Sequence, residues 1–283
     1  MTTLFKTPQG EQAVKTCYQA MLDQWPVHNR HLRLPTRQGE TFVLASGSQD
    51  KPALVLLHGS ASNSASWVAD VPLWSQSFNV FAVDLIGEPG LSAPSRPPLA
   101  SEAYAEWLDD VMEGLGLSSA SFVGLSLGGW VALDYAIRRS ERVEKLVLLS
   151  PGGIGRNRNI LVWALPLLLL GSWGRRKMQE RIGGATLTAA SFTNSPMGAL
   201  TETIFAHFKP RTSPLPQPTT EQLRRLVMPV MAILGGKDVF IDAPRTRDRL
   251  EENVTRLTMR YLPEAPHFIP DQSEAVLDFL RGG

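Results

Sequence analysis

The sequence predicts an α/β fold, with a mostly parallel, doubly wound sheet and an inserted helical cap. The first observation is a set of short apolar runs without polar alternation, which is typical of strands buried on both faces of a parallel sheet. Segments with a helical spacing of apolar residues lie between these runs, so helices are expected on both faces of the sheet. A further interval of roughly 70 residues lacks such runs and is too long for a simple crossover. The runs are Ala53–Leu57, Val80–Val83, Ser121–Gly124, Lys145–Leu149 and Val230–Leu234.

Before the first of these runs, the sequence predicts a helix and an antiparallel pair of strands. Apolar residues recur at helical spacing from Ala13 to Trp25, with a start signal at Thr7-Pro8 and a stop at Pro26. The segments His31–Pro35 and Thr41–Ala45 then indicate two short strands joined by a turn, at the edge of the sheet.

Three further helices are expected between or after the buried strands. Ser101 can cap a helix that ends at Gly116, and a second helix follows Ser126 and extends to Arg138. The last helix is expected to begin at Asp271, because Asp271 to Glu274 has the pattern of a capping box.

The long interval from Gly152 to Gln222 predicts a cap subdomain inserted into the sheet. The expected division is a core over residues 1–152, a helical cap over 153–222 and the rest of the core over 223–283. Its apolar segment Ile160–Leu170 contains Pro166 and is too short for a membrane span, which takes about 20 apolar residues. We therefore expect a buried or half-buried helix pair there. A helix is expected over Leu200–Phe208, followed by a stiff proline-rich return linker.

The composition excludes several classes of function. The chain has 283 residues, and 28 basic against 27 acidic side chains give a formal charge of +1. A near-neutral chain has no broad electrostatic field, so nucleic acid is not an expected partner. Cys17 is the single cysteine, which excludes metal clusters built on cysteine and suits a reducing, cytoplasmic compartment. The first ten residues have no basic stretch followed by an apolar run, so no secretory signal is expected. A homodimer is compatible with these features.

The strongest chemical signal is Gly124-Leu125-Ser126-Leu127-Gly128, directly after a predicted strand and directly before a predicted helix. A Gly-x-Ser-x-Gly elbow needs glycines because the strand-to-helix turn is tight, and it presents its serine at the end of the sheet. Ser126 is therefore the candidate nucleophile.

A serine nucleophile needs a base and an acid, and the chain order Ser, acid, His places both downstream. His267 lies in a loop before the last helix and is the candidate base. Asp238 follows the run Val230–Leu234 and is the candidate acid, with Asp242 as its competitor. His207, inside the cap, is expected to be structural or to line the pocket.

The tetrahedral intermediate needs two hydrogen-bond donors. One is expected to be the backbone N–H of Leu127, next after the nucleophile. The other should come from the loop His58-Gly59-Ser60-Ala61, where Ser60 is the first candidate and Ala61 the second. His58 is expected to brace this loop.

These residues together resemble the α/β-hydrolase superfamily. The landmarks are His58-Gly59, Gly124–Gly129, Asp238 and His267, and the turn Asp84–Ser92 is similar to the family's Asp-x-x-Gly-x-Gly-x-Ser with one extra residue. Most of the chain resembles the bacterial carboxylesterase NP group. The resemblance implies an α/β-hydrolase sheet and a serine hydrolase that cleaves carboxylic esters through an acyl-enzyme, without a cofactor.

Some positions depart from that pattern, and two other functions stay open. Pro266 stands where a glycine usually precedes the histidine, and Asp238 stands where the esterase group can have Glu. A carbon–carbon bond hydrolase would use the same triad, but such relatives usually carry Trp where Phe268 follows His267. A non-catalytic ligand-binding protein is the other alternative. The apolar cap, with Trp163 and Trp173, favours small or medium hydrophobic esters as substrates.

Overall fold

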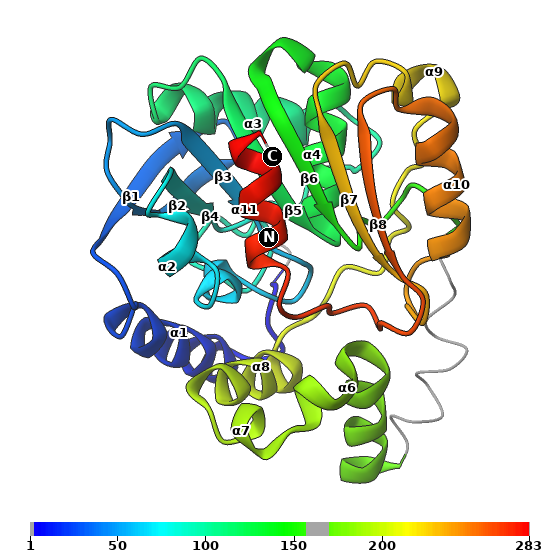
Figure 1. The fold of residues 1–283 in the computed structure, drawn as a ribbon. Helices are drawn as coiled ribbons and strands as arrows, with labels where there is room; N and C mark the ends of the chain where they lie inside the picture. The colour runs from blue at the N-terminus through cyan, green and yellow to red at the C-terminus, as the bar shows by residue number, and fades with distance from the viewer. Residues whose placement is uncertain (1–2, 157–169, 283) are drawn as a thin grey trace.

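The computed structural model describes residues 3–156 and 170–282, and it is built around one eight-stranded sheet (Figure 1). The strand order is β1-β2-β4-β3-β5-β6-β7-β8. β2 pairs antiparallel with β1 and β4, and the remaining pairs are parallel. The predicted fold class is thus confirmed. The strands are β1 (Asn29–Thr36), β2 (Gly39–Ser46), β3 (Ala53–Leu57), β4 (Asn79–Val83), β5 (Ala120–Leu125), β6 (Val143–Leu149), β7 (Val230–Gly235) and β8 (Leu257–Leu262).

Helices cover both faces of the sheet, and a further group of helices lies below the ends of the strands in the view of Figure 1. One face carries α1 (Pro8–Asp23), η1 (Ser64–Trp67), α2 (Val71–Trp74) and α11 (Ser273–Arg281). The other face carries α3 (Ala103–Gly114), α4 (Leu127–Arg138) and α10 (Ala243–Asn253). The remaining helices are η2 (Ser140–Arg142), α6 (Gly171–Thr188), α7 (Ala190–Thr193), α8 (Pro196–His207) and α9 (Thr220–Leu223).

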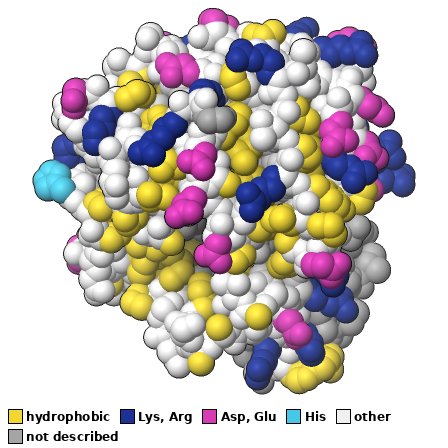
Figure 2. Space-filling model, in the orientation of Figure 1, with side chains coloured by type: hydrophobic (Ala, Val, Ile, Leu, Met, Phe, Trp, Pro, Cys, Tyr) yellow, Lys and Arg dark blue, Asp and Glu magenta, His cyan; other side chains and the backbone are white. Residues whose placement is uncertain are grey.

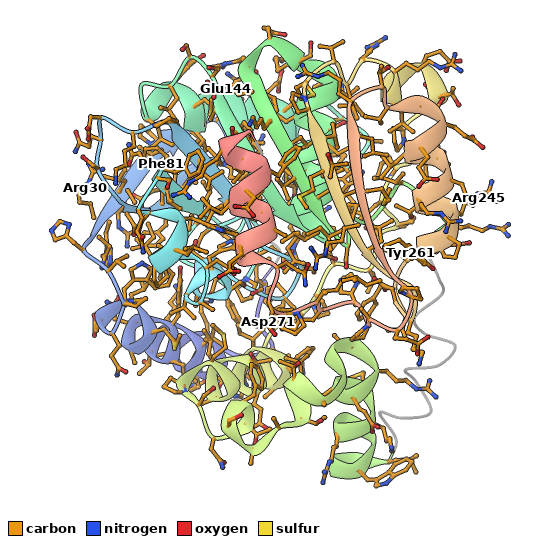
Figure 3. All side chains as sticks on the ribbon, in the orientation of Figure 1. Arg30, Phe81, Glu144, Arg245, Tyr261 and Asp271 are labelled. Carbon is orange, nitrogen blue, oxygen red and sulfur yellow. The ribbon has the colours of Figure 1, made fainter. Side chains whose placement is uncertain are left out.

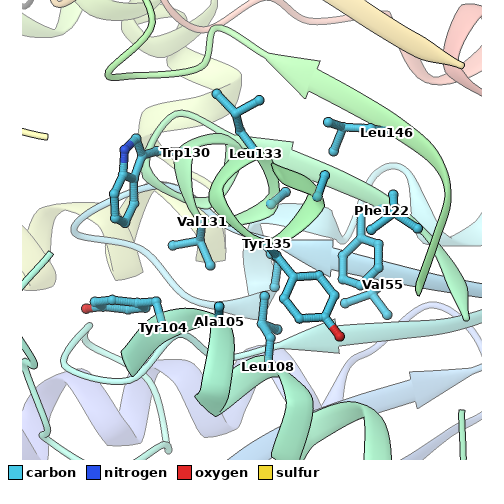
Figure 4. Close-up of a cluster of buried hydrophobic side chains, with 14 of the residues drawn as sticks. Val55, Tyr104, Ala105, Leu108, Phe122, Trp130, Val131, Leu133, Tyr135 and Leu146 are labelled. Atoms are coloured by element: carbon cyan, nitrogen blue, oxygen red, sulfur yellow. The ribbon is translucent and has the colours of Figure 1, made fainter. Parts of the chain in front are cut away.

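The sheet separates two hydrophobic clusters, because successive strand residues point to opposite faces. In β3, Val55 and Leu57 belong to the cluster under α3 and α4, whereas Leu54 and Leu56 belong to the cluster on the other face. All four are fully buried. Figure 4 shows part of the first cluster, where Trp130 and Tyr135 of α4 lie among side chains from α3 and the strands.

The predicted strands and most of the predicted helices are confirmed. α1 begins after Thr7, whose side chain accepts a hydrogen bond from the Gly10 N–H. The predicted edge pair forms β1 and β2. α4 begins directly after Ser126, and α8 begins at Pro196 and contains most of the helix expected over Leu200–Phe208.

The two predicted caps differ from the structure. α11 begins at Ser273, and Asp271 has a left-handed φ of 59°, so the chain turns there before it enters the helix. The predicted capping box is therefore wrong. Asp271 lies in the segment that crosses the lower edge of the sheet (Figure 3). α3 begins at Ala103, although the Ser101 hydroxyl accepts from the Ala103 N–H at 3.3 Å.

Between β6 and β7, the described residues form helices α6 to α9, with α8 lying against α1 (Figure 1). An antiparallel bridge joins Phe5 to Phe208, and their rings meet edge to face at 5.6 Å. The apolar segment Ile160–Leu170 falls outside the described residues except for Leu170. Among the helices that are described, none has the length and apolarity to cross a membrane.

Charged side chains of both signs are interspersed over the face shown in Figure 2. Hydrophobic atoms gather on this face between the sheet and the lower helices. This distribution agrees with the near-neutral net charge, because no large region of one sign is visible on this face.

Candidate active site

Ser126 sits at the sharp turn between β5 and α4. Its φ of 52° and ψ of −107° are unusual for a residue with a side chain, and such strain is common at functional sites. A β-carbon at Gly128 would lie 2.0 Å from the Leu57 carbonyl oxygen, and one at Gly124 would lie 2.5 Å from the Gly128 oxygen. These two positions therefore accept only glycine, and the close packing holds the serine at the carboxyl end of the strand.

His267 and Asp238 form a buried hydrogen-bonded pair. The Nδ1–Oδ2 distance is 2.6 Å, and the two residues are 8% and 0% exposed. The other oxygen, Oδ1, accepts from the N–H groups of Phe240 and Ile241 at 2.7 and 3.1 Å. An ionised carboxylate can only accept, so Nδ1 carries the proton and Nε2 is the ring nitrogen that can accept another. The Phe240 ring packs edge to face on the imidazole at 4.7 Å.

The competing acid, Asp242, has a different place. It is the N-cap of α10, and its side chain accepts from the Arg245 N–H at 3.2 Å. The geometry thus brings Asp238, rather than Asp242, to His267.

Two hydrogen bonds connect the serine turn to the histidine loop through the end of β6. The Ser126 N–H donates to the Leu149 carbonyl at 2.9 Å, and the next residue, Ser150, donates from its hydroxyl to the His267 carbonyl at 2.8 Å. Ser150 is buried and has a φ of 42°. Sequence reasoning did not single it out, and its neighbours contain no motif that would have done so.

The loop after β3 lies against the serine turn. A β-carbon at Gly59 would be 3.7 Å from the Ser126 β-carbon. The Ala61 N–H donates to Glu88 Oε2 at 2.6 Å. Among the described residues, the N–H groups of Ser60 and Leu127 donate to no acceptor. The arrangement therefore favours Ser60 over Ala61 as the second donor.

His58 is buried and braces this loop, as expected. Its Nε2 accepts from the Leu85 N–H at 2.9 Å, so its Nδ1 carries the proton and donates to the Gly59 carbonyl at 2.8 Å. Burial lowers the pKa of His58, which favours this neutral form. His207 lies against α1, since a β-carbon at Gly10 would be 2.7 Å from its ring.

Glu88 is a second residue near the site that sequence reasoning missed. It is 2% exposed, and burial raises its pKa to about 7. The extra residue in the turn Asp84–Ser92 was the available signal, but a turn sequence alone does not show where its side chain points. Within the described part of the chain, no group of three His, Cys, Asp or Glu side chains could hold a metal ion.

The sequence matches the alpha/beta hydrolase family over residues 54–279. Carboxylesterase YbfK of Bacillus subtilis is 30% identical over 274 residues, which are 94% of this chain and 93% of that protein. An uncharacterized carboxylesterase, nap, of the same organism is 40% identical over 134 residues, which cover 47% of this chain and 45% of that protein.

Solved structures with the same architecture extend over nearly the whole chain. Naproxen esterase (carboxylesterase NP) from Bacillus subtilis gives a TM-score of 0.83 at 26% identity, with 98% of both chains covered. Carboxylesterase CesB (YbfK) from Bacillus subtilis gives 0.82 at 28% identity, covering 97% of this chain and 99% of that one. The chain therefore belongs to the alpha/beta hydrolase family and is a carboxylesterase-type hydrolase, an enzyme that cleaves carboxylic esters.

Proposed function

We propose that this carboxylesterase cleaves small to medium hydrophobic esters through an acyl-enzyme on Ser126, with His267 as general base and Asp238 as its orienting acid. The observation that carries this proposal is the buried Asp238–His267 pair, joined through Leu149 and Ser150 to the strained turn at Ser126. That arrangement supports a triad because each member follows the carboxyl end of a strand, and these parallel strands all end at the same end of the sheet.

The hydrogen-bond donors and acceptors of the site are suited to ester hydrolysis. Nε2 of His267 takes the Ser126 proton while the serine oxygen forms a bond to the ester carbonyl carbon. The imidazolium then gives that proton to the leaving alcohol. Asp238 stabilises the imidazolium through Nδ1. Water releases the acid from Ser126 by the same base, which regenerates the free serine.

The backbone N–H groups of Leu127 and Ser60 are the proposed oxyanion donors. Leu127 is the first residue of α4, so its N–H has no partner within the helix and adds to the positive end of the helix dipole. A donor of this kind contributes about 3 kcal/mol to the stabilisation of the transition state.

The substrate class is proposed from the cap. We assign residues 153–222 to this cap, and α6 lies directly over the histidine loop, because the Phe268 N–H donates to the Ile182 carbonyl at 2.9 Å. A cap in that position restricts the size of the ester. Trp173, expected in the pocket lining, is 55% exposed in this structure, and Trp163 lies outside the described residues. Cys17 is a free thiol, which supports the proposed cytoplasmic location.

The test is hydrolysis of p-nitrophenyl esters, from acetate to laurate, by the wild type, Ser126→Ala and a control, Ser101→Ala. Ser101 donates to the Pro98 carbonyl just before α3 and is not part of the proposed triad. We expect turnover of the short and medium esters, a loss of about 10,000-fold or more in kcat for Ser126→Ala, and little change for the control. An active Ser126→Ala variant, or a wild type inactive on every ester, would contradict the proposal.

A further inference from the structure

The extra residue in the turn Asp84–Ser92 brings a buried carboxylate to the oxyanion loop. We propose that Glu88 is a positioning residue that holds the Ser60 N–H in the orientation needed to bind the oxyanion. This inference rests on the proposed function, because it needs a tetrahedral intermediate on Ser126.

The contact is between Glu88 and the peptide next to the proposed donor. Glu88 Oε2 accepts from the Ala61 N–H at 2.6 Å, and the Ser60 hydroxyl lies at 3.5 Å from the same oxygen. Ala61 has a left-handed φ of 53°, which is unfavourable for a residue with a side chain. The hydrogen bond thus stabilises the Ser60–Ala61 peptide, which is joined through the Ser60 α-carbon to the peptide that carries the Ser60 N–H.

The turn that carries Glu88 is itself fixed from several sides. Asp84 Oδ2 accepts from the Leu91 N–H at 2.8 Å, and Asp84 Oδ1 accepts from the Ser64 N–H at 2.8 Å. The Asn63 side chain donates to the Pro89 carbonyl at 3.0 Å. These bonds join the turn to the residues that directly follow the oxyanion loop, so the carboxylate has a fixed place relative to Ser60.

Three titratable or charged side chains face Glu88: Arg96 from the same loop after β4, Tyr104 from α3 and Arg211 from the return segment of the cap. Arg96 donates to the carbonyls of Gly87 and Lys209 at 2.9 and 2.8 Å. The two guanidinium groups offset the negative charge of an ionised Glu88, which would otherwise oppose the oxyanion. The Glu88 carboxylate can therefore accept from the Ala61 N–H without placing a strong negative potential at the oxyanion.

The role as an acceptor can be separated from the charge by two substitutions. Glu88→Gln keeps an oxygen and the side-chain length but removes the charge, whereas Glu88→Ala removes the acceptor. If Glu88→Ala does not fold, Glu88→Asp takes its place, because it moves the acceptor back by one methylene. Asp70→Ala and Asp70→Asn are the matched controls, since Asp70 is a half-buried acid that accepts from Ser273 of α11.

The experiment measures kcat and KM for p-nitrophenyl butyrate and the affinity for an alkyl boronic acid, which forms a tetrahedral adduct with a serine hydroxyl. We expect Glu88→Ala to lower kcat about 10- to 100-fold, with KM within about threefold of the wild type, because the oxyanion exists only after attack. The boronic acid should bind more weakly by a similar factor. Glu88→Gln should restore both to within about threefold, and the Asp70 pair should change neither.

The other outcomes would overturn the inference. They are an unchanged kcat and boronic acid affinity in Glu88→Ala, an effect on KM alone, or a Glu88→Gln variant as impaired as Glu88→Ala. The failure of the proposed function looks different, because an active Ser126→Ala variant would exclude the acyl-enzyme whatever the Glu88 variants do.

Discussion

The floor of the site and the cap above it are held in place by different kinds of contact. In the floor, Ser126, Asp238 and His267 follow strand ends, and buried hydrogen bonds and backbone packing closer than a β-carbon allows fix their positions. One end of the cap is held by the side chains that α8 buries and by the backbone bridge between Phe5 and Phe208, whereas α6 has no fully buried side chain among its described residues. This difference teaches that the chemistry and the choice of substrate depend on separate parts of the chain.

Among the helices of the cap that the structure describes, α6 and α8 also differ. α8 buries Leu200 and Ile204 against the N-terminal helix α1. In α6, every described side chain is half-buried or exposed, and the helix is interrupted at Gly184, whose φ is 59°. Of the two described helices, α6 can thus change its position at the lower cost in free energy.

The largest expected effect comes from the acid of the floor. Asp238→Asn should lower kcat about 10,000-fold, because an amide nitrogen cannot accept from Nδ1 and the imidazole loses its orientation and its counter-charge. Steady-state kinetics on p-nitrophenyl butyrate would measure this, and circular dichroism would show that the variant is folded.

The matched substitution is Asp242→Ala on the neighbouring helix. It removes the N-cap of α10 and should lower the unfolding free energy by about 1 kcal/mol, with kcat nearly unchanged. Equal losses of kcat in the two variants would show that Asp238 has no special part in the floor.

A pair of glycines compares the floor with the cap directly. Gly128→Ala should cost at least about 3 kcal/mol of unfolding free energy, because its β-carbon would meet the Leu57 oxygen at 2.0 Å. Gly184→Ala should cost about 1 to 3 kcal/mol, because its nearest contact is Pro266 Cγ at 3.5 Å and only its backbone, with φ 59° and ψ −144°, opposes a side chain. Chemical denaturation would measure both.

The kinetic effects of this pair should differ as well. Gly128→Ala should lower kcat for every ester, whereas Gly184→Ala should mainly change KM for the longer esters. A Gly184→Ala variant that loses activity on p-nitrophenyl acetate would contradict this difference between floor and cap, since it would show that α6 also positions the catalytic residues.

The same division explains what the sequence could predict. Local sequence patterns predict the floor of the site. They are the apolar runs that form β3 to β7, and Gly124–Gly128 between a strand and a helix. The contacts of Ser150 and Glu88 could not be predicted, because both depend on which segments the fold brings together. The start of α11 was misplaced because a capping pattern at Asp271 does not reveal a left-handed backbone.

The last predicted effect concerns pH at the junction of floor and cap, where Glu88 faces Arg96 and Arg211. Burial raises the pKa of Glu88 from 4.5 to about 7. Between pH 4.5 and about pH 7, Glu88 is therefore protonated in the folded protein but ionised in the unfolded chain. The stability that this proton contributes to the folded protein is lost as the pH rises through about 7. The unfolding free energy of the wild type relative to Glu88→Gln should fall by at most about 3 kcal/mol between pH 4.5 and pH 8.

Asp70→Asn is the control for this pH effect. Burial raises the pKa of Asp70 from 3.8 to about 6. The unfolding free energy of the wild type relative to Asp70→Asn should therefore fall at lower pH and be constant above about pH 7. Urea denaturation at half-unit pH steps separates the two curves. If the wild type and Glu88→Gln curves run parallel from pH 5 to pH 8, Glu88 is ionised throughout. The arginines from the junction would then fully offset its burial, and the cap would contribute to the electrostatics of the floor as well as to the selection of the ester.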